Sequence, residues 1–184
     1  TDNDKYVAIG NYEPGNLVIL DAISMEILKT IPLTMEKDGK QIESRAGAVV
    51  EDGNRIIVAL KDGTSVWAVD TDQPGFPVTH KFSDIGEGKP ALHDGFLTPD
   101  GSYYIVASQG SKTAWVLDLA TMKPIAEVET DETPHTGPGA AWGKYIYVPA
   151  LGEGLITVID ITTWKPVKYI KTGGPGLFVR SYSK

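Results

Sequence analysis

Residues 92–96, Leu-His-Asp-Gly-Phe, open a stretch of sequence that closes with residues 133–137, Thr-Pro-His-Thr-Gly. The stretch carries His93 and His135, two of the three histidines of the chain, and each stands two residues before a glycine. The histidines are 42 residues apart (135 − 93), and other residues recur at the same offset. These are Tyr103, Asp118, Lys123 and Pro124, which return as Tyr145, Asp160, Lys165 and Pro166. The two histidines therefore occupy the same place in two successive copies of one structural unit.

The repeat continues toward the N-terminus. An offset of 48 residues (93 − 45) relates Arg45 to His93, and an offset of 49 (70 − 21) relates Asp21 to Asp70. Self-similarity at about 40–50 residues, in segments rich in strand-forming residues, is typical of β-propeller blades. We therefore predict an all-β chain that forms a single partial β-propeller domain of four-stranded antiparallel sheets. Its four blade repeats cover about residues 1–33, 45–83, 93–130 and 135–172.

The two ends of the repeat complement each other. The first unit lacks the strand that opens each later unit, and residues 34–44 read as a polar connector. An offset of 39 residues (174 − 135) places Gly174 on the His135 position, so residues 173–184 are expected to form the opening strand of a further blade. This strand could close a four-bladed ring, or the repeats could belong to a larger propeller, since propellers have about 4–8 blades.

Local sequence also predicts details within each unit. Opening strands are expected over residues 46–50, 96–98 and 140–142, and Tyr103 and Tyr104 are expected to pack between blades. The aspartate that ends each third strand should cap the following turn through backbone groups. These aspartates are Asp21, Asp70, Asp118 and Asp160.

Composition excludes several classes of function. The net charge of −7 argues against a duplex nucleic-acid partner, which would need a basic face. The chain has no cysteine, which excludes disulfides, thiolate metal sites and covalent haem attachment through Cys-x-x-Cys-His. No apolar run approaches the roughly 20 residues that span a bilayer, so no membrane span is expected. The start falls inside a repeat, so the absence of a signal peptide decides nothing.

Three residues share one position in the repeat: Arg45, His93 and His135. In a propeller the first strand of each blade lines the central channel, so three potentially cationic side chains would surround one rim of it. Two interpretations stay open on the pattern alone. The residues form a ligand site, or the histidines are hydrogen-bonded turn residues. A zinc site from His93, Asp94 and His135 is a third possibility, although we expect no metal centre.

Leu-His-Asp-Gly-Phe (92–96) and Thr-Pro-His-Thr-Gly-Pro-Gly-Ala (133–140) resemble motifs of the haem d1-binding eight-bladed propellers. This family includes cytochrome cd1 nitrite reductase and its relatives NirF and NirN, which act in haem d1 biosynthesis. Residues 5–12 and 174–181 look more like the NirF branch. The resemblance covers nearly the whole chain and implies that the four repeats are half of an eight-bladed propeller.

The resemblance also implies a set of site residues. His93 and His135 match the catalytic pair on the distal side of haem d1, which in the reductase protonates nitrite. Arg45 and Arg180 suit the carboxylates of the macrocycle, because guanidinium binds carboxylates bidentately. Gly137 completes the cofactor-binding set. The implied cofactor is haem d1 or its precursor, the implied small anion is nitrite, and the implied compartment is the periplasm.

The chain departs from this family in that its axial-histidine motif, its c-haem domain and about half of its blades are not found. The chain alone should therefore be incomplete, and a homodimer or the remainder of the propeller is an expected partner. Our leading hypothesis is a haem d1-binding propeller segment, in haem d1 biosynthesis or nitrite reduction, and any enzyme activity would be that of an oxidoreductase. The alternatives are a non-catalytic interaction scaffold and a metal- or quinone-dependent dehydrogenase.

Overall fold

The computed structural model describes residues 4–37, 39–87, 89 and 91–181, and all the regular elements in them are β-strands. Consecutive strands pair antiparallel into sheets, which we call blades 1 to 4. Blade 1 contains β1 (Tyr6–Asn11), β2 (Asn16–Asp21) and β3 (Ile27–Pro32). Blade 2 contains β6 (Ala46–Asp52), β7 (Arg55–Leu60), β8 (Val66–Asp70) and β9 (Val78–Phe82). Blade 3 contains β10 (Leu92–Leu97), β11 (Tyr103–Ser108), β12 (Thr113–Asp118) and β13 (Lys123–Glu129), and blade 4 contains β14 (Ala141–Trp142), β15 (Tyr145–Pro149), β16 (Leu155–Asp160) and β17 (Lys165–Lys171).

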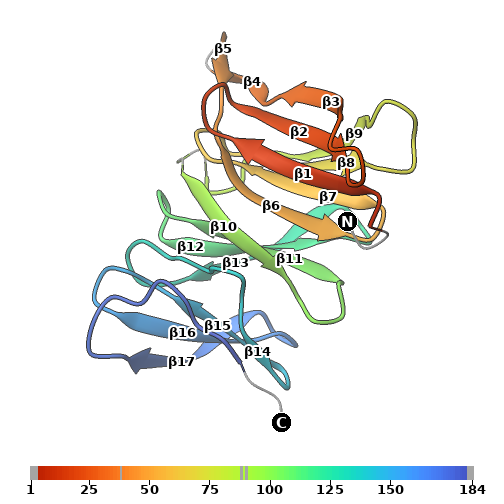
Figure 1. The fold of residues 1–184 in the computed structure, drawn as a ribbon. Helices are drawn as coiled ribbons and strands as arrows, with labels where there is room; N and C mark the ends of the chain where they lie inside the picture. The colour runs from red at the N-terminus through yellow and green to blue at the C-terminus, as the bar shows by residue number, and fades with distance from the viewer. Residues whose placement is uncertain (1–3, 38, 88, 90, 182–184) are drawn as a thin grey trace.

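The blades follow one another in chain order, with blade 1 at one end of the molecule and blade 4 at the other (Figure 1). The three-stranded sheet of blade 1 agrees with the prediction that this unit lacks its opening strand. In the described part of the chain, β1 pairs only with β2, and residues 172–181 lie in no strand. The ring of four blades closed by the C-terminal segment is therefore not formed. Whether residues 173–184 open a further blade stays a prediction, and residues 182–184 lie outside the described residues.

The expected connector at residues 34–44 is a β-hairpin instead, formed by β4 (Thr34–Lys37) and β5 (Lys40–Glu43). Lys37 pairs with Lys40, and the sequence between them is Asp-Gly, a strong hairpin signal. A connector was predicted from the sequence because the segment is mostly polar. Met35 anchors the hairpin by packing against the core between blades 1 and 2.

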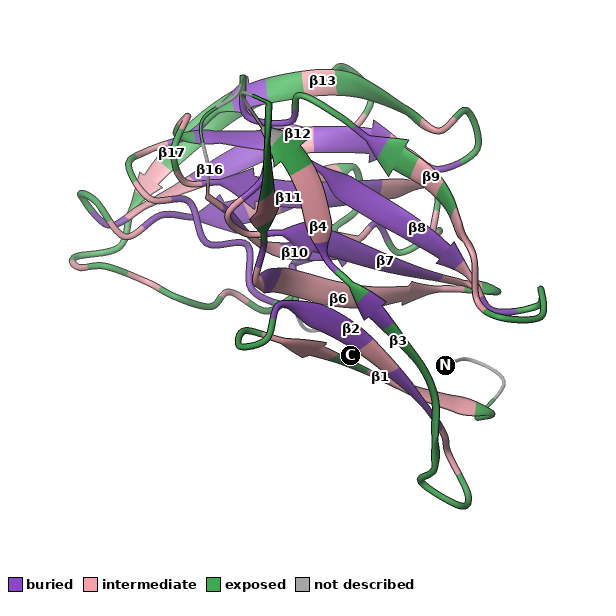
Figure 2. Ribbon diagram, turned by 90° about the horizontal axis from the view of Figure 1, so that it is seen from above, coloured by how far each residue is buried: buried purple, intermediate pink, exposed green. Residues whose placement is uncertain are grey.

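Each neighbouring pair of blades encloses one hydrophobic core. The second and third strands of a blade are buried on both faces, so β7 and β11 are almost continuously buried (Figure 2). The outer strands β3 and β13 are mostly exposed. Tyr104 is fully buried in the core between blades 2 and 3, which confirms its predicted packing role.

The turns after the third strands are capped as predicted. The Oδ1 atom of each repeated aspartate accepts a hydrogen bond from the backbone N–H two residues later, for example Ile23 on Asp21 and Thr162 on Asp160, both at 2.9 Å. At Asp21, Asp70 and Asp118 the same oxygen also accepts from the next N–H. These bonds are local, so a short sequence pattern is enough to predict them.

Candidate functional site

The two repeated histidines are held by backbone irregularities at the starts of blades 3 and 4. Strand β10 begins at Leu92, earlier than the predicted residue 96, so His93 lies within the strand. The pairing of β10 with β11 shifts register between Leu92 and Gly95, and such a bulge redirects the side chains it contains. His135 lies six residues before β14, next to the isolated bridge between Pro134 and Ala150, and its backbone N–H donates to the Pro149 carbonyl oxygen at 2.9 Å.

The structure brings His93 and His135 together. Their ring centroids are 5.0 Å apart, and the ring planes are inclined by 44°. His135 is buried, whereas the side chain of His93 is 21% exposed. The His135 and Phe178 rings form a T-shaped pair, with 5.5 Å between the centroids. The equivalence of the two histidines in the repeat therefore becomes direct proximity in space.

Asp94 lies between the two rings. Its Oδ1 atom is 2.9 Å from His93 Nδ1, with hydrogen-bond geometry. Its Oδ2 atom is 2.7 Å from His135 Nδ1, a contact without hydrogen-bond geometry. The His135 nitrogen is instead hydrogen-bonded to the Leu177 carbonyl oxygen at 2.9 Å. Asp94 thus binds His93 by a hydrogen bond and contacts His135 as an ion-pair partner.

The charge of Asp94 follows from its surroundings. Burial by itself raises the pKa of this carboxyl group, but the hydrogen bond with His93 and the charges of the two imidazoles lower it. The net pKa lies below the ordinary value, so Asp94 is a carboxylate at neutral pH. The site therefore holds a fixed negative charge beside two groups that can become cationic.

Tyr104 lies beneath this carboxylate and was not predicted as a site residue. Its hydroxyl group is buried without a hydrogen-bond partner among the described residues. Burial, followed by the negative charge of Asp94, raises the pKa of Tyr104, so the phenol is neutral. A Cβ atom at position 95 would lie 2.6 Å from Tyr104 Cε2, which explains why a glycine follows Asp94.

A pocket of about 260 Å³ opens beside the pair. It is lined by Ala48, Val49, Asp94, Gly95, Gly137, Pro138 and Phe178. Gly137 has a φ of +54°, and a Cβ there would lie 2.8 Å from the Phe178 ring. The predicted Gly137 therefore does lie at the site, where its small size keeps one wall of the pocket open.

The two predicted arginines are placed differently. Arg45 is paired within the chain, because its Nε donates to Asp62 Oδ2 at 2.9 Å and its Nη2 donates to Asp62 Oδ1. Its guanidinium also lies over the Tyr12 ring, 5.3 Å from the centroid. Arg180 is exposed and lines a separate pocket of about 200 Å³ with Trp142 and Tyr147. Neither arginine lines the pocket beside the histidines.

The residues of the zinc alternative do lie together: one possible ligand atom from each of His93, Asp94 and His135 lies within 4.8 Å of the others. Both Nδ1 atoms contact Asp94 directly, at 2.9 and 2.7 Å. The zinc site stays an untested alternative. His80, the third histidine, packs against Phe82 on the outer strand β9.

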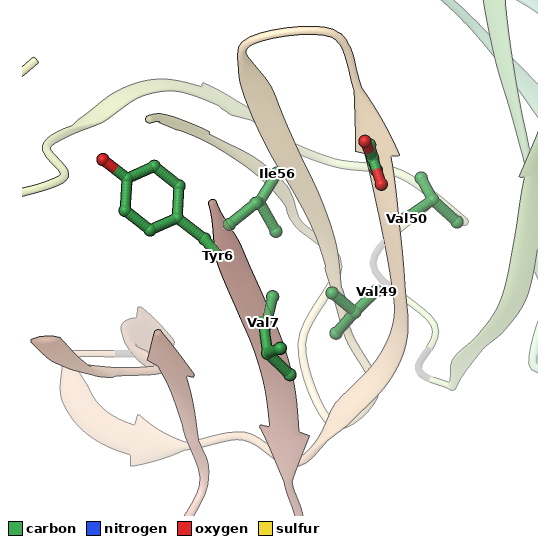
Figure 3. A pocket seen from close by; sticks show the side chains of 7 residues that line it. Tyr6, Val7, Val49, Val50 and Ile56 are labelled. Carbon is green, nitrogen blue, oxygen red and sulfur yellow. The ribbon is translucent and has the colours of Figure 1, made fainter. Parts of the chain in front are cut away.

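A larger pocket, of about 310 Å³, lies elsewhere, at the edge of β1. Figure 3 shows Tyr6 and Val7 on β1 separated by this space from Val49 and Val50 on β6, with Ile56 of β7 behind them. The pocket borders the position where blade 1 has no opening strand. Val49 lines both this pocket and the one beside Asp94, so β6 separates the two.

The sequence and the structure were compared with known proteins. The model of the cytochrome D1 heme domain family matches residues 1–184. Protein NirF of Stutzerimonas stutzeri is 35% identical over 113 residues, which cover 61% of this chain and 28% of the relative. The dihydro-heme d1 dehydrogenase of Pseudomonas aeruginosa is 34% identical over the whole chain and 37% of the relative. A nitrite reductase of Stutzerimonas stutzeri is 26% identical over 146 residues.

A solved structure of the dihydro-heme d1 dehydrogenase NirN in complex with DHE superposes with a TM-score of 0.82 at 30% identity. The superposition covers all of this chain and 39% of that protein. The matched residues therefore span about 24–39% of the length of these relatives. In the described residues, no helix is long and apolar enough to cross a membrane.

Proposed function

The chain belongs to the cytochrome D1 heme domain family, and on that premise we propose that it supplies part of a binding site for a haem d1-type tetrapyrrole, with His93 and His135 on the distal face. Membership confirms the resemblance read from the two histidine motifs. It also confirms the all-β propeller fold, because NirN superposes over the whole chain. The chain is thus a NirF- and NirN-like haem d1 domain.

One observation carries the proposal: two imidazoles 5.0 Å apart contact one half-buried carboxylate at the edge of a pocket. The small residues Ala48, Gly95 and Gly137 line this pocket, which suits the approach of a flat macrocycle. Haem d1, when bound, supplies the redox-active iron centre. The contribution of this chain is to hold two imidazoles that can donate or accept a proton near neutral pH.

Within the family we favour the biosynthetic branch, with haem d1 or its precursor as the ligand. NirF and the dihydro-heme d1 dehydrogenase are 35% and 34% identical to this chain, and the nitrite reductase is 26% identical. Histidines on the distal face could move protons to or from the macrocycle in an oxidoreductase of this branch. In the reductase branch the same pair would protonate nitrite.

The roles of Arg45 and Arg180 are part of the proposal. Both would bind carboxylates of the macrocycle. The guanidinium of Arg45 already forms a bidentate pair with the Asp62 carboxylate. Arg45 would have to release Asp62 before it could bind a carboxylate of the macrocycle. Arg180 is exposed on the same C-terminal segment that carries Phe178 against His135.

We further propose that more blades complete the ring at the edge of β1, from a longer chain or from a second copy. The 310 Å³ pocket between β1 and β6 is where an opening strand for blade 1 would lie. An unpaired strand edge favours such pairing. Light scattering tests the homodimer: a mass near twice 19.8 kDa supports it, and a monomer contradicts it. By resemblance, the protein would act in the periplasm.

A spectrophotometric titration with haem d1 tests the main proposal. The protein should bind the tetrapyrrole with a change in its visible bands, and the His93→Ala/His135→Ala double variant should alter those bands. His80→Ala is the matched control, because His80 lies on the outer strand β9. If the protein does not bind haem d1, the interaction scaffold, in which the two histidines are rim turn residues, becomes the better explanation.

A further inference from the structure

We propose that Asp94 is a positioning residue that fixes the proton of His93 on Nδ1, while the Leu177 carbonyl oxygen does the same for His135. Each neutral ring then keeps the lone pair on Nε2. The proposal concerns the protein without ligand. It therefore stands or falls independently of tetrapyrrole binding.

Each Nδ1 atom faces an oxygen that can only accept a hydrogen bond. A backbone carbonyl oxygen can only accept a hydrogen bond, and so can an ionised carboxylate. His93 Nδ1 lies 2.9 Å from Asp94 Oδ1, and His135 Nδ1 lies 2.9 Å from Leu177 O. Each Nδ1 must therefore carry the proton, because the facing atom has none to donate.

The two rings depend on Asp94 to different degrees. His93 has Asp94 as its hydrogen-bond partner at Nδ1. His135 has the Leu177 carbonyl oxygen in addition to its 2.7 Å contact with Asp94 Oδ2. Removing the carboxylate should release His93 and leave His135 in place. If only His93 responds, Asp94 acts by orienting that ring. If both histidines respond, the substitution has disturbed the fold.

The carboxylate itself is firmly positioned. Asp94 is half-buried and lies in the bulge of β10 between Leu92 and Gly95. Tyr104 fills the space under Gly95, so the backbone there has little freedom to shift. A rigid carboxylate of this kind fixes ring orientation as well as the tautomer.

The chemical consequence rests on the proposed function. With Nδ1 engaged, a neutral ring offers the Nε2 lone pair to a bound ligand, and a protonated ring offers an Nε2–H donor. Asp94 would thereby act on proton transfer through the histidines.

Ring-nitrogen NMR of the ¹⁵N-labelled protein tests the assignment, since the long-range proton couplings identify which nitrogen is protonated. At a pH where the rings are neutral, His93 and His135 should both be Nδ1–H. In Asp94→Ala, His93 should change to the Nε2–H form that imidazole prefers in water, and His135 should not change. His80 serves as the internal control in every spectrum.

Two further variants keep the test decisive. Asp94→Asn preserves the shape of the side chain and should raise the share of the Nε2–H form of His93, because its amide NH2 can donate to Nδ1 whereas the carboxylate can only accept. Asp118→Asn removes the same charge from a turn of the same blade and should leave both rings unchanged. The proposal is overturned if His93 is Nε2–H in the unaltered protein, or if it stays Nδ1–H in both Asp94 variants. A haem d1 titration of the unaltered protein measures tetrapyrrole binding separately. Failure of the tautomer assignment can therefore be told apart from failure of the proposed function.

Discussion

The Tyr104 ring lies against the backbone of Gly95, so close that a Cβ atom at residue 95 would lie 2.6 Å from Tyr104 Cε2. Gly95 follows the carboxylate that joins the two histidines, and Tyr104 belongs to the core between blades 2 and 3. The geometry of the site is thereby tied to the packing of the core. Substitutions in this core should therefore change the positions of Asp94 and the two histidine rings.

Gly95→Ala should destabilise the protein by about 1–3 kcal/mol, the usual cost of overpacking a core. Urea unfolding measures the loss, and the ring-nitrogen spectrum of His93 should change because Asp94 must move. Tyr104→Phe should not rescue Gly95→Ala, since the clash involves ring carbons that phenylalanine retains. A full rescue by Tyr104→Phe would contradict this account of the glycine.

Tyr104→Phe alone should leave the stability unchanged or raise it. The Tyr104 hydroxyl is buried without a partner in the described structure, and such a group costs about 1–3 kcal/mol. Urea unfolding at neutral pH checks this expectation. A loss of more than about 1 kcal/mol would mean that the hydroxyl is hydrogen-bonded in solution.

Asp160 should make stability depend on acid pH. The hydrogen bond with Lys144, followed by those with Thr162, lowers the pKa of Asp160 to about 2. An aspartate in the unfolded chain titrates near pKa ~3.9, so its stabilisation is complete above that pH and is lost as the pH falls toward 2. The difference in unfolding midpoint between the unaltered protein and Asp160→Asn should therefore shrink between about pH 4 and pH 2. A difference that stays constant down to pH 2 would contradict the prediction.

Asp62→Asn should strengthen haem d1 binding if Arg45 binds a carboxylate of the macrocycle. The variant weakens the ion pair that now engages Arg45, and pairs of this exposure are worth up to about 1 kcal/mol, or roughly fivefold in affinity. Titration of the two proteins measures the effect. Glu132→Gln, which breaks the exposed Lys112–Glu132 pair at 2.6 Å, is the control for the change in net charge. Unchanged or weaker binding by Asp62→Asn would argue that Arg45 has a structural role only.

Much of the fold could be read from local pattern. Turn residues and strand alternation recur at offsets of 42 to 49 residues, so the blades and the caps at Asp21, Asp70, Asp118 and Asp160 were predictable. The hairpin at β4 and β5 was missed because polar composition outweighed the Asp-Gly turn signal. The aspartate caps and the hairpin turn are each encoded by a few neighbouring residues.

The sequence by itself determined that His93 and His135 are equivalent, because the repeat assigns them one position in two successive blades. Only the tertiary structure decided their environment. The carboxylate between the rings, the Leu177 carbonyl oxygen on His135 and the Asp62 partner of Arg45 join residues 1 to 42 positions apart. No periodic pattern encodes such contacts. They depend on how one twisted sheet packs against the next, which is set by the shapes of buried side chains such as Tyr104.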